Sequence, residues 1–125
     1  MTVVFRRTAI AAAALLALAV VPLALAHPAL LRSTPAQGAA VAPTAQIDLE
    51  FNEAVMPRAT QLQLSMGHGS MQMPMAPAQQ QVLDDGHTLR ATFGSLLPAG
   101  SYRLQWRAVG QDSHPMTGEF TFTIK

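Results

Sequence analysis

Alternation of apolar and polar residues along short segments is the feature that most restricts the fold of this chain. It is clearest in residues 101–107, where Tyr102, Leu104 and Trp106 face one way and the polar residues between them face the other. The same two-residue period recurs in segments 45–51, 61–64, 88–93 and 119–124. This period is typical of half-buried β-strands, so we expect the tyrosine and the tryptophan in the core.

Turn signals separate these predicted strands. Pro98-Ala99-Gly100 precedes the clearest one, and residues 84–87 (Asp-Asp-Gly-His) precede another, which leaves His87 exposed in a hairpin turn. No helix is expected beyond the N-terminal segment. Many short strands in about a hundred residues indicate an all-β domain, a small antiparallel Greek-key β-barrel or sandwich.

Residues 1–26 are predicted to be a secretory signal peptide. Arg6 and Arg7 supply a positive start, residues 8–26 are almost wholly apolar, and Ala24 and Ala26 form an Ala-x-Ala cleavage site. The alternative is an uncleaved membrane anchor, since the apolar run approaches the roughly 20 residues that a spanning helix needs. Pro22 and the small residues favour cleavage. We therefore expect residues 27–125 to form the mature domain, a soluble monomer.

Charge and cysteine content exclude several classes of function. The chain has 8 Lys and Arg against 7 Asp and Glu, and removal of Arg6 and Arg7 leaves 6 against 7 (8 − 2 = 6). A nearly neutral domain gives no electrostatic basis for binding nucleic acid or anionic lipid. Because cysteine is absent, any metal ligands must be nitrogen, oxygen or thioether atoms.

His27 is a candidate copper ligand because cleavage after Ala26 would make it the mature N-terminus. One residue would then offer two nitrogen donors, the α-amine and the imidazole. Pro28 has no backbone N–H, so copper could not displace an amide proton there and would be left with those two donors. The alternative is a histidine that merely follows the cut.

Asp112 and His114 could complete a Cu(II) site. If residues 109–118 stay extended, these two side chains face the same way. With His27 they give three nitrogens and one oxygen, a set that suits Cu(II). An ordinary polar loop would also contain such a pair. Glu53 could orient an imidazole from outside the ligand set, or could be a solvated turn carboxylate.

Residues 66–75 contain four methionines and a histidine, which are Met66, His68, Met71, Met73 and Met75. Thioethers are soft ligands that favour Cu(I), and the intervening Gly, Ser, Gln and Pro residues form no apolar stripe. The sequence therefore predicts a Cu(I) site in a Met-rich loop. The alternative is that the methionines pack as adaptable core residues or lie in a flexible loop.

These motifs resemble the CopC family of periplasmic copper-resistance proteins, also called PcoC-like. The resemblance covers essentially all of residues 27–125 and rests on segments 27–31 (His-Pro-Ala-Leu-Leu), 49–55 (Leu-Glu-Phe-Asn-Glu-Ala-Val), 85–89, 98–107, 112–115 (Asp-Ser-His-Pro) and 118–122. It implies a cupredoxin-like Greek-key barrel that carries copper in the periplasm without catalysis. It also implies Cu(II) ligation by His27, Asp112 and His114, a separate Met/His Cu(I) site in some members, and an inner-membrane copper transporter of the CopD type as partner.

Two other functions stay open at this point. A copper-dependent oxygenase can also use an N-terminal histidine chelate, but it needs an open coordination position, which Asp112 would occupy here. The third hypothesis is a structural Ig-like domain with incidental histidines. Metal content of the exported protein would separate it from the other two.

Overall fold

The computed structural model describes residues 27–125; the predicted signal peptide, residues 1–26, lies outside the described part. The described chain forms nine strands. In order they are β1 (Leu30–Thr34), β2 (Ala40–Val41), β3 (Gln46–Phe51), β4 (Gln61–His68), β5 (Met71–Met75), β6 (Gln79–Val82), β7 (Thr88–Thr92), β8 (Gly100–Val109) and β9 (Pro115–Ile124). The described residues contain no helix that is long and apolar enough to cross a membrane.

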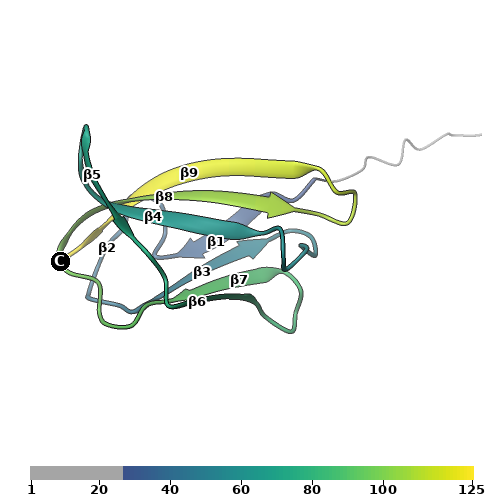
Figure 1. The fold of residues 1–125 in the computed structure, drawn as a ribbon, viewed down its shortest axis with the longest axis horizontal. Coiled ribbons are helices and arrows are strands. Elements are labelled where there is room, and N and C mark those ends of the chain that lie inside the picture. Colours follow the sequence, from purple (N-terminus) through teal and green to yellow (C-terminus); the bar gives the residue numbers. More distant parts are fainter. Residues whose placement is uncertain (1–26) are drawn as a thin grey trace, which may run out of the picture.

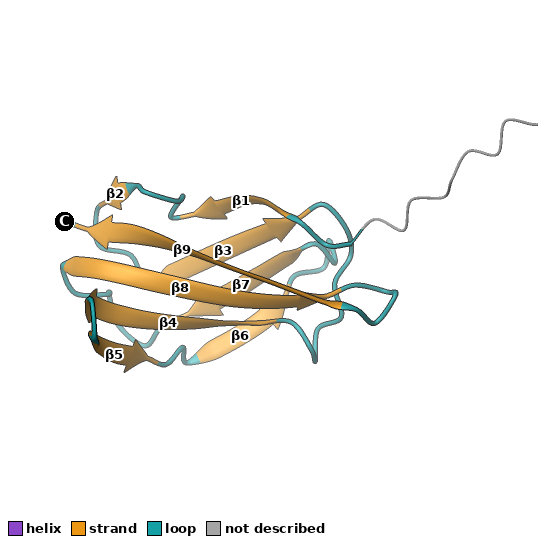
Figure 2. Ribbon diagram, turned by 90° about the horizontal axis from the view of Figure 1, so that it is seen from above, coloured by secondary structure: helices purple, strands orange, loops and turns teal. Residues whose placement is uncertain are grey.

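The strands form two sheets that pack face to face (Figure 1). One sheet has the order β1-β3-β7-β6 and is antiparallel throughout. The other has the order β2-β9-β8-β4-β5, which Figure 2 shows, and its one parallel pair is β2 with β9. The predicted all-β antiparallel fold is confirmed, and the two separate sheets make it a sandwich.

The alternating residues form the core between the sheets. Tyr102 and Leu104 of β8 are buried, and Tyr102 stacks on Phe122 of β9 with ring centroids 5.3 Å apart. The Tyr102 hydroxyl donates a hydrogen bond to the Pro98 carbonyl at 2.6 Å, so this buried polar atom has a partner. Trp106 is partly buried and meets Phe51 of the opposite sheet edge to face, at 5.3 Å. Both aromatic residues therefore lie in or against the core, as predicted.

Four strands, β1, β2, β5 and β6, were not expected from the alternation. β6 pairs with β7 although three of its four residues are glutamine. β1 and β2 contain few alternating residues, and their pairing is set by tertiary contacts with β3 and β9. β5 lies within the Met-rich segment, which is a β-hairpin with β4 and not a loop. Its turn is Gly69-Ser70, and Gly69 has φ +58°, which suits the first position of a type II′ turn.

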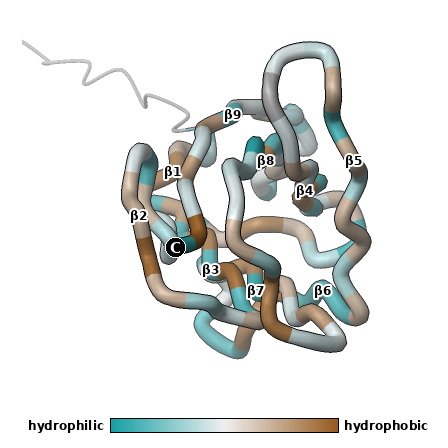
Figure 3. Tube along the Cα trace, turned by 90° about the vertical axis from the view of Figure 1, so that its left-hand side faces the viewer, coloured by the Kyte–Doolittle hydropathy of each residue, from teal (hydrophilic) through white to brown (hydrophobic). Residues whose placement is uncertain are grey.

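Strand β8 links the two ends of the sandwich. The turn from β8 to β9 (residues 110–114) lies at one end, beside the start of the described chain. The β4–β5 hairpin projects at the other end, next to the start of β8, and Figure 3 views the molecule from that side. Ten strand residues at about 3.3 Å each separate these ends by about 30 Å.

Candidate metal centre

The segment that carries Asp112 and His114 is a tight turn, so the extended conformation considered from the sequence does not occur there. Ser113 has φ 65°, and its N–H donates to the Gly110 carbonyl at 3.0 Å. The N–H of His114 donates to Asp112 Oδ1 at 3.1 Å. Because the chain reverses here, the two side chains still converge, but through local hydrogen bonds and not through strand alternation.

The N-terminal segment is held against this turn by Pro28. The Pro28 side chain is fully buried, and a Cβ added to Gly110 would lie 2.9 Å from its Cγ and 3.3 Å from Asp112 Oδ1. Gly110 also forms an antiparallel bridge with buried Val55. A glycine is therefore required for this close approach, which could not be predicted from the sequence.

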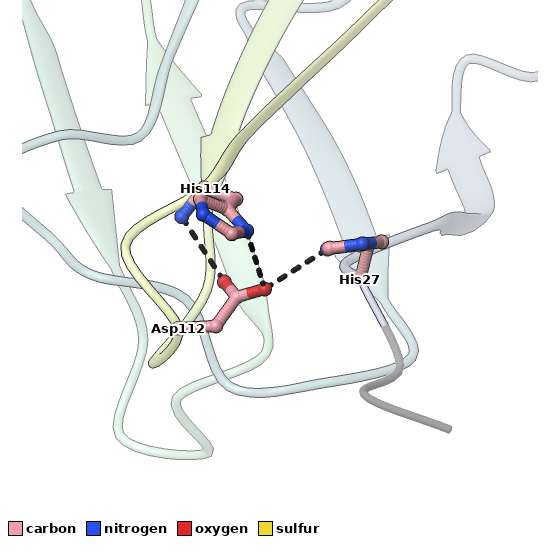
Figure 4. A group of neighbouring side chains, drawn as sticks. All are labelled: His27, Asp112 and His114. Atoms are coloured by element: carbon pink, nitrogen blue, oxygen red, sulfur yellow. Dashed lines mark hydrogen bonds and ion pairs between the residues drawn. The ribbon is translucent and has the colours of Figure 1, made fainter. Parts of the chain in front are cut away.

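The structure brings His27, Asp112 and His114 together, and Figure 4 shows all three side chains pointing toward one another. His27 Nδ1 lies 2.9 Å from Asp112 Oδ2, and His114 Nδ1 lies 3.4 Å from the same oxygen. One ligand atom from each residue lies within 4.8 Å of the others. Opposite ligands of one metal ion lie about 4 Å apart, so a small inward shift suffices to bind a cation.

The Asp112 carboxylate is suited to a cation. The hydrogen bond from the His114 N–H lowers the pKa of Asp112 below its ordinary value, and the neighbouring imidazoles act in the same direction. Its Oδ2 is shielded from solvent but makes no hydrogen bond of good geometry within residues 27–125. The 2.9 Å contact with His27 Nδ1 is therefore an ion-pair distance without hydrogen-bond alignment. A bound metal ion would satisfy this oxygen.

Two other polar side chains near this end differ in what they contact. Glu53 is half-buried, and within the described residues no hydrogen bond or ion pair is found between its carboxylate and an imidazole, so its orienting role stays a prediction. His87 is half-buried and not exposed as expected, with Nδ1 3.3 Å from the Phe51 carbonyl oxygen. Asp85 accepts the His87 N–H at 2.9 Å and folds this turn inward.

The β4–β5 register places the methionines on one face of the hairpin. Met66 lies opposite Met73, and Met75 lies opposite Leu64. Met66 also lies opposite buried Tyr102 of β8. Because directly opposite residues share a face, the methionines continue the core face of the sheet beyond the sandwich. His68 lies opposite Met71 along the backbone; its side chain is outside the described part.

Burial divides the four methionines into two pairs. Met71 and Met73 are exposed, with 80% and 62% of their surface accessible. Met66 and Met75 are partly buried and pack against the core. The packing alternative thus applies to the second pair, whereas the first pair is exposed to solvent.

Local contacts shape this hairpin. Gly67 has φ +138°, and a Cβ there would lie 1.8 Å from the Met71 carbonyl oxygen, so no other residue fits. The Gln72 amide donates to the Gly69 carbonyl at 3.1 Å, and the Ser65 hydroxyl donates to Gln72 Oε1 at 3.0 Å. Side-chain hydrogen bonds therefore stabilise the tip of the hairpin, which projects beyond the core.

Known proteins share both the sequence and the fold. Residues 30–125 match the CopC domain family. Copper resistance protein C of Pseudomonas syringae pv. tomato is 42% identical over 106 residues, covering 82% of this chain and 84% of that protein. The crystal structure of PcoC, a methionine-rich copper resistance protein from Escherichia coli, matches with a TM-score of 0.73 and 39% identity, over 80% of this chain and 100% of that one. Copper transport protein CutJ of Bacillus subtilis is 28% identical over 100 residues, which cover 79% of this chain and 18% of that protein.

The fold and the clustered histidines and aspartate define a β-sandwich with a candidate metal centre at one end. Since the family model matches most of the chain, the protein belongs to the CopC family. The resemblance drawn from the sequence motifs is confirmed.

Proposed function

We propose that this protein carries or buffers copper in the periplasm and holds Cu(II) between His27, Asp112 and His114. Membership in the CopC family, with relatives named copper resistance proteins, gives the chain a role in copper binding and resistance. Copper is the cargo of this role. What we propose beyond this role is the oxidation state of the copper, the residues that bind it and the periplasmic location.

The observation that carries the proposal is the shielded Asp112 Oδ2, which faces two imidazole nitrogens without a well-directed hydrogen bond. Nitrogen and carboxylate donors suit Cu(II), the divalent ion with the highest affinity for such sites. The His27 atom nearest this oxygen is Nδ1, the ring nitrogen that closes a six-membered chelate with the α-amine of the same residue. Cleavage after Ala26 would therefore add a fourth donor.

A second, Cu(I) site is proposed on the hairpin. Met71 and Met73 lie two residues apart on one strand, about 7 Å, with Met66 directly opposite Met73. The exposed thioethers of Met71 and Met73 form a soft donor set for Cu(I), whereas Met66 packs against the core. His68, which is paired with Met71 in the register, is the proposed additional ligand.

We further propose that the protein exchanges copper with an inner-membrane transporter of the CopD type and catalyses no reaction. The match to part of a longer copper transport protein supports work beside a transporter. An oxygenase needs a coordination position for oxygen, and Asp112 would fill one. A carrier needs no such position.

Titration of the exported, processed protein with Cu(II) tests this function. We expect one Cu(II) per chain, with an electron paramagnetic resonance spectrum of mixed nitrogen and oxygen ligation that is lost in His114→Ala. Binding of Cu(I) to that variant should equal binding to the wild type. An unchanged Cu(II) spectrum in His114→Ala would contradict the proposed ligand set.

A further inference from the structure

Asn52 makes two hydrogen bonds to the backbone of Ala29, one to its N–H and one to its carbonyl. Its side-chain Oδ1 accepts the Ala29 N–H at 2.7 Å, and its own N–H donates to the Ala29 carbonyl at 3.0 Å. These bonds continue the pairing of β1 with β3 one residue beyond Leu30 and Phe51. In a regular antiparallel pair the main-chain oxygen of Asn52 would accept the first bond. The chain bends at Asn52, and the side-chain oxygen takes that place.

Ala29 lies two residues from the candidate ligand His27, and Pro28 connects them. Pro28 is fully buried against Gly110, has a fixed φ and has no N–H that would be left without a partner on burial. With Ala29 and Pro28 both held, His27 keeps little backbone freedom. Its imidazole is thereby directed at Asp112 in the turn between β8 and β9.

We propose that Asn52 is the residue that positions His27 for copper. The inference rests on the proposed Cu(II) site, but it concerns a residue for which no hydrogen bond to His27, Asp112 or His114 is found within residues 27–125. Within residues 27–125, Asn52 is the acceptor found for the Ala29 N–H. Without that acceptor, binding of copper would have to order the segment that Asn52 now holds in place, and the ordering lowers affinity.

The effect on copper should exceed the effect on folding. The Ala29–Asn52 bond is exposed, so water replaces it in the variant and the sandwich loses little. Residues that orient metal ligands from outside the ligand set typically change metal affinity 10- to 100-fold. We expect Asn52→Ala to weaken Cu(II) binding about tenfold, near the lower limit, because Pro28 still packs against Gly110.

Gln80 offers a matched control. Its amide oxygen accepts the Leu62 N–H at 2.9 Å and its amide nitrogen donates to the Leu62 carbonyl at 3.0 Å. Like Asn52, it joins a side-chain amide to the backbone of another segment, but it contacts no residue of the metal centre. Gln80→Ala should lower the thermal midpoint and leave Cu(II) affinity within about twofold of wild type.

The experiment compares wild type, Asn52→Ala, Asn52→Asp and Gln80→Ala, each beginning at His27, by competition with a Cu(II)-binding dye. Asn52→Asp keeps an acceptor oxygen in the same place, so it should bind Cu(II) at least as tightly as wild type, whereas Asn52→Ala should be about tenfold weaker. Equal affinity of Asn52→Ala and wild type would overturn the inference. So would an Asn52→Asp protein as weak as Asn52→Ala, or equal losses in Asn52→Ala and Gln80→Ala. Absence of Cu(II) binding by the wild type would instead contradict the proposed function.

Discussion

The two ends of the sandwich hold their candidate copper ligands on different supports. At one end His27 and Asp112 are anchored by a buried proline, a close glycine contact and a tight turn. At the other end Met71 and Met73 stand exposed on β5, an edge strand paired with β4. The candidate ligand atoms at the first end are nitrogen and oxygen, and those at the second end are sulfur.

This difference matches the coordination chemistry of the two oxidation states. Cu(II) prefers tetragonal nitrogen and oxygen ligands, so a support that fixes ligand positions before binding favours it. Cu(I) has a filled d shell, like Zn²⁺, and no geometric preference from its d electrons. A hairpin with flexible thioethers can therefore suit Cu(I) without a rigid support. Substitutions at one end should therefore leave copper binding at the other end unchanged.

Removing a ligand at the anchored end should have the largest effect. His114→Ala is expected to weaken Cu(II) binding about 1,000-fold, about 4 kcal/mol, while Cu(I) binding stays unchanged. His114 is exposed, so the fold should be retained. Competition titrations of both ions and a circular dichroism melt measure this. A parallel loss of Cu(I) affinity would show that the two ends are not independent.

At the hairpin, the exposed and packed methionines should respond differently. Replacing Met71 and Met73 together by Leu is expected to weaken Cu(I) binding 10- to 100-fold, about 1.4–2.8 kcal/mol, with no measurable change in unfolding free energy. Leu keeps the apolar bulk and removes the sulfur.

The matched control replaces Met66 and Met75 by Leu. These side chains pack against the core, so unfolding free energy should change by up to about 1.5 kcal/mol. Cu(II) binding should be the same in both double variants. Unchanged Cu(I) affinity after replacement of Met71 and Met73 would contradict a Cu(I) site on this face of the hairpin.

Two glycines test the supports themselves. A Cβ at Gly110 would press on Pro28, so Gly110→Ala should cost about 1–3 kcal/mol of stability and weaken Cu(II) binding about tenfold. A Cβ at Gly67 would collide with the Met71 carbonyl, so Gly67→Ala should disrupt the hairpin and reduce Cu(I) binding only. Urea unfolding and both copper titrations check the pair. A change in Cu(I) affinity in Gly110→Ala, or in Cu(II) affinity in Gly67→Ala, would show that the two ends are not supported independently.

A smaller effect concerns acid stability of the metal-free protein. The pKa of Asp112 is lowered by the His114 N–H, so its contribution to stability is present above the unfolded value of about 3.9 and is lost as pH falls through the lower folded pKa. The stability difference between wild type and Asp112→Asn should therefore shrink as the pH falls from about 5 to 2. Asp85 and Glu119 also have lowered pKa values, but both proteins keep them, so their effect cancels. A pH-independent difference would count against this account.

The sequence revealed what depends on period and residue chemistry. Alternation located the core strands around Tyr102 and Leu104, and side-chain type identified His27, Asp112 and His114 as donors that the fold brings together. It did not predict β5, although Met71, Met73 and Met75 alternate with Gln72 and Pro74, because the proline and the preceding Gly and Ser residues are typical of a loop.

Contacts between distant segments could not be predicted from the sequence either. The Pro28–Gly110 packing and the Asn52–Ala29 bonds join residues 82 and 23 positions apart, and nothing local in the chain encodes them. The turn at Ser113 was missed because a serine with positive φ is uncommon.

In the proposed Cu(II) site, His27 binds as a free N-terminus, and this role can be tested by extending the chain by one residue. Cu(II) affinity should be measured for the protein that begins at His27 and for the same protein with one additional residue before it. The extension turns the α-amine of His27 into an amide and breaks the chelate, while the imidazole beside Asp112 remains. We predict an affinity loss of at least about 100-fold, about 3 kcal/mol, with Cu(I) binding unchanged. Equal Cu(II) affinity of the two proteins would contradict the account.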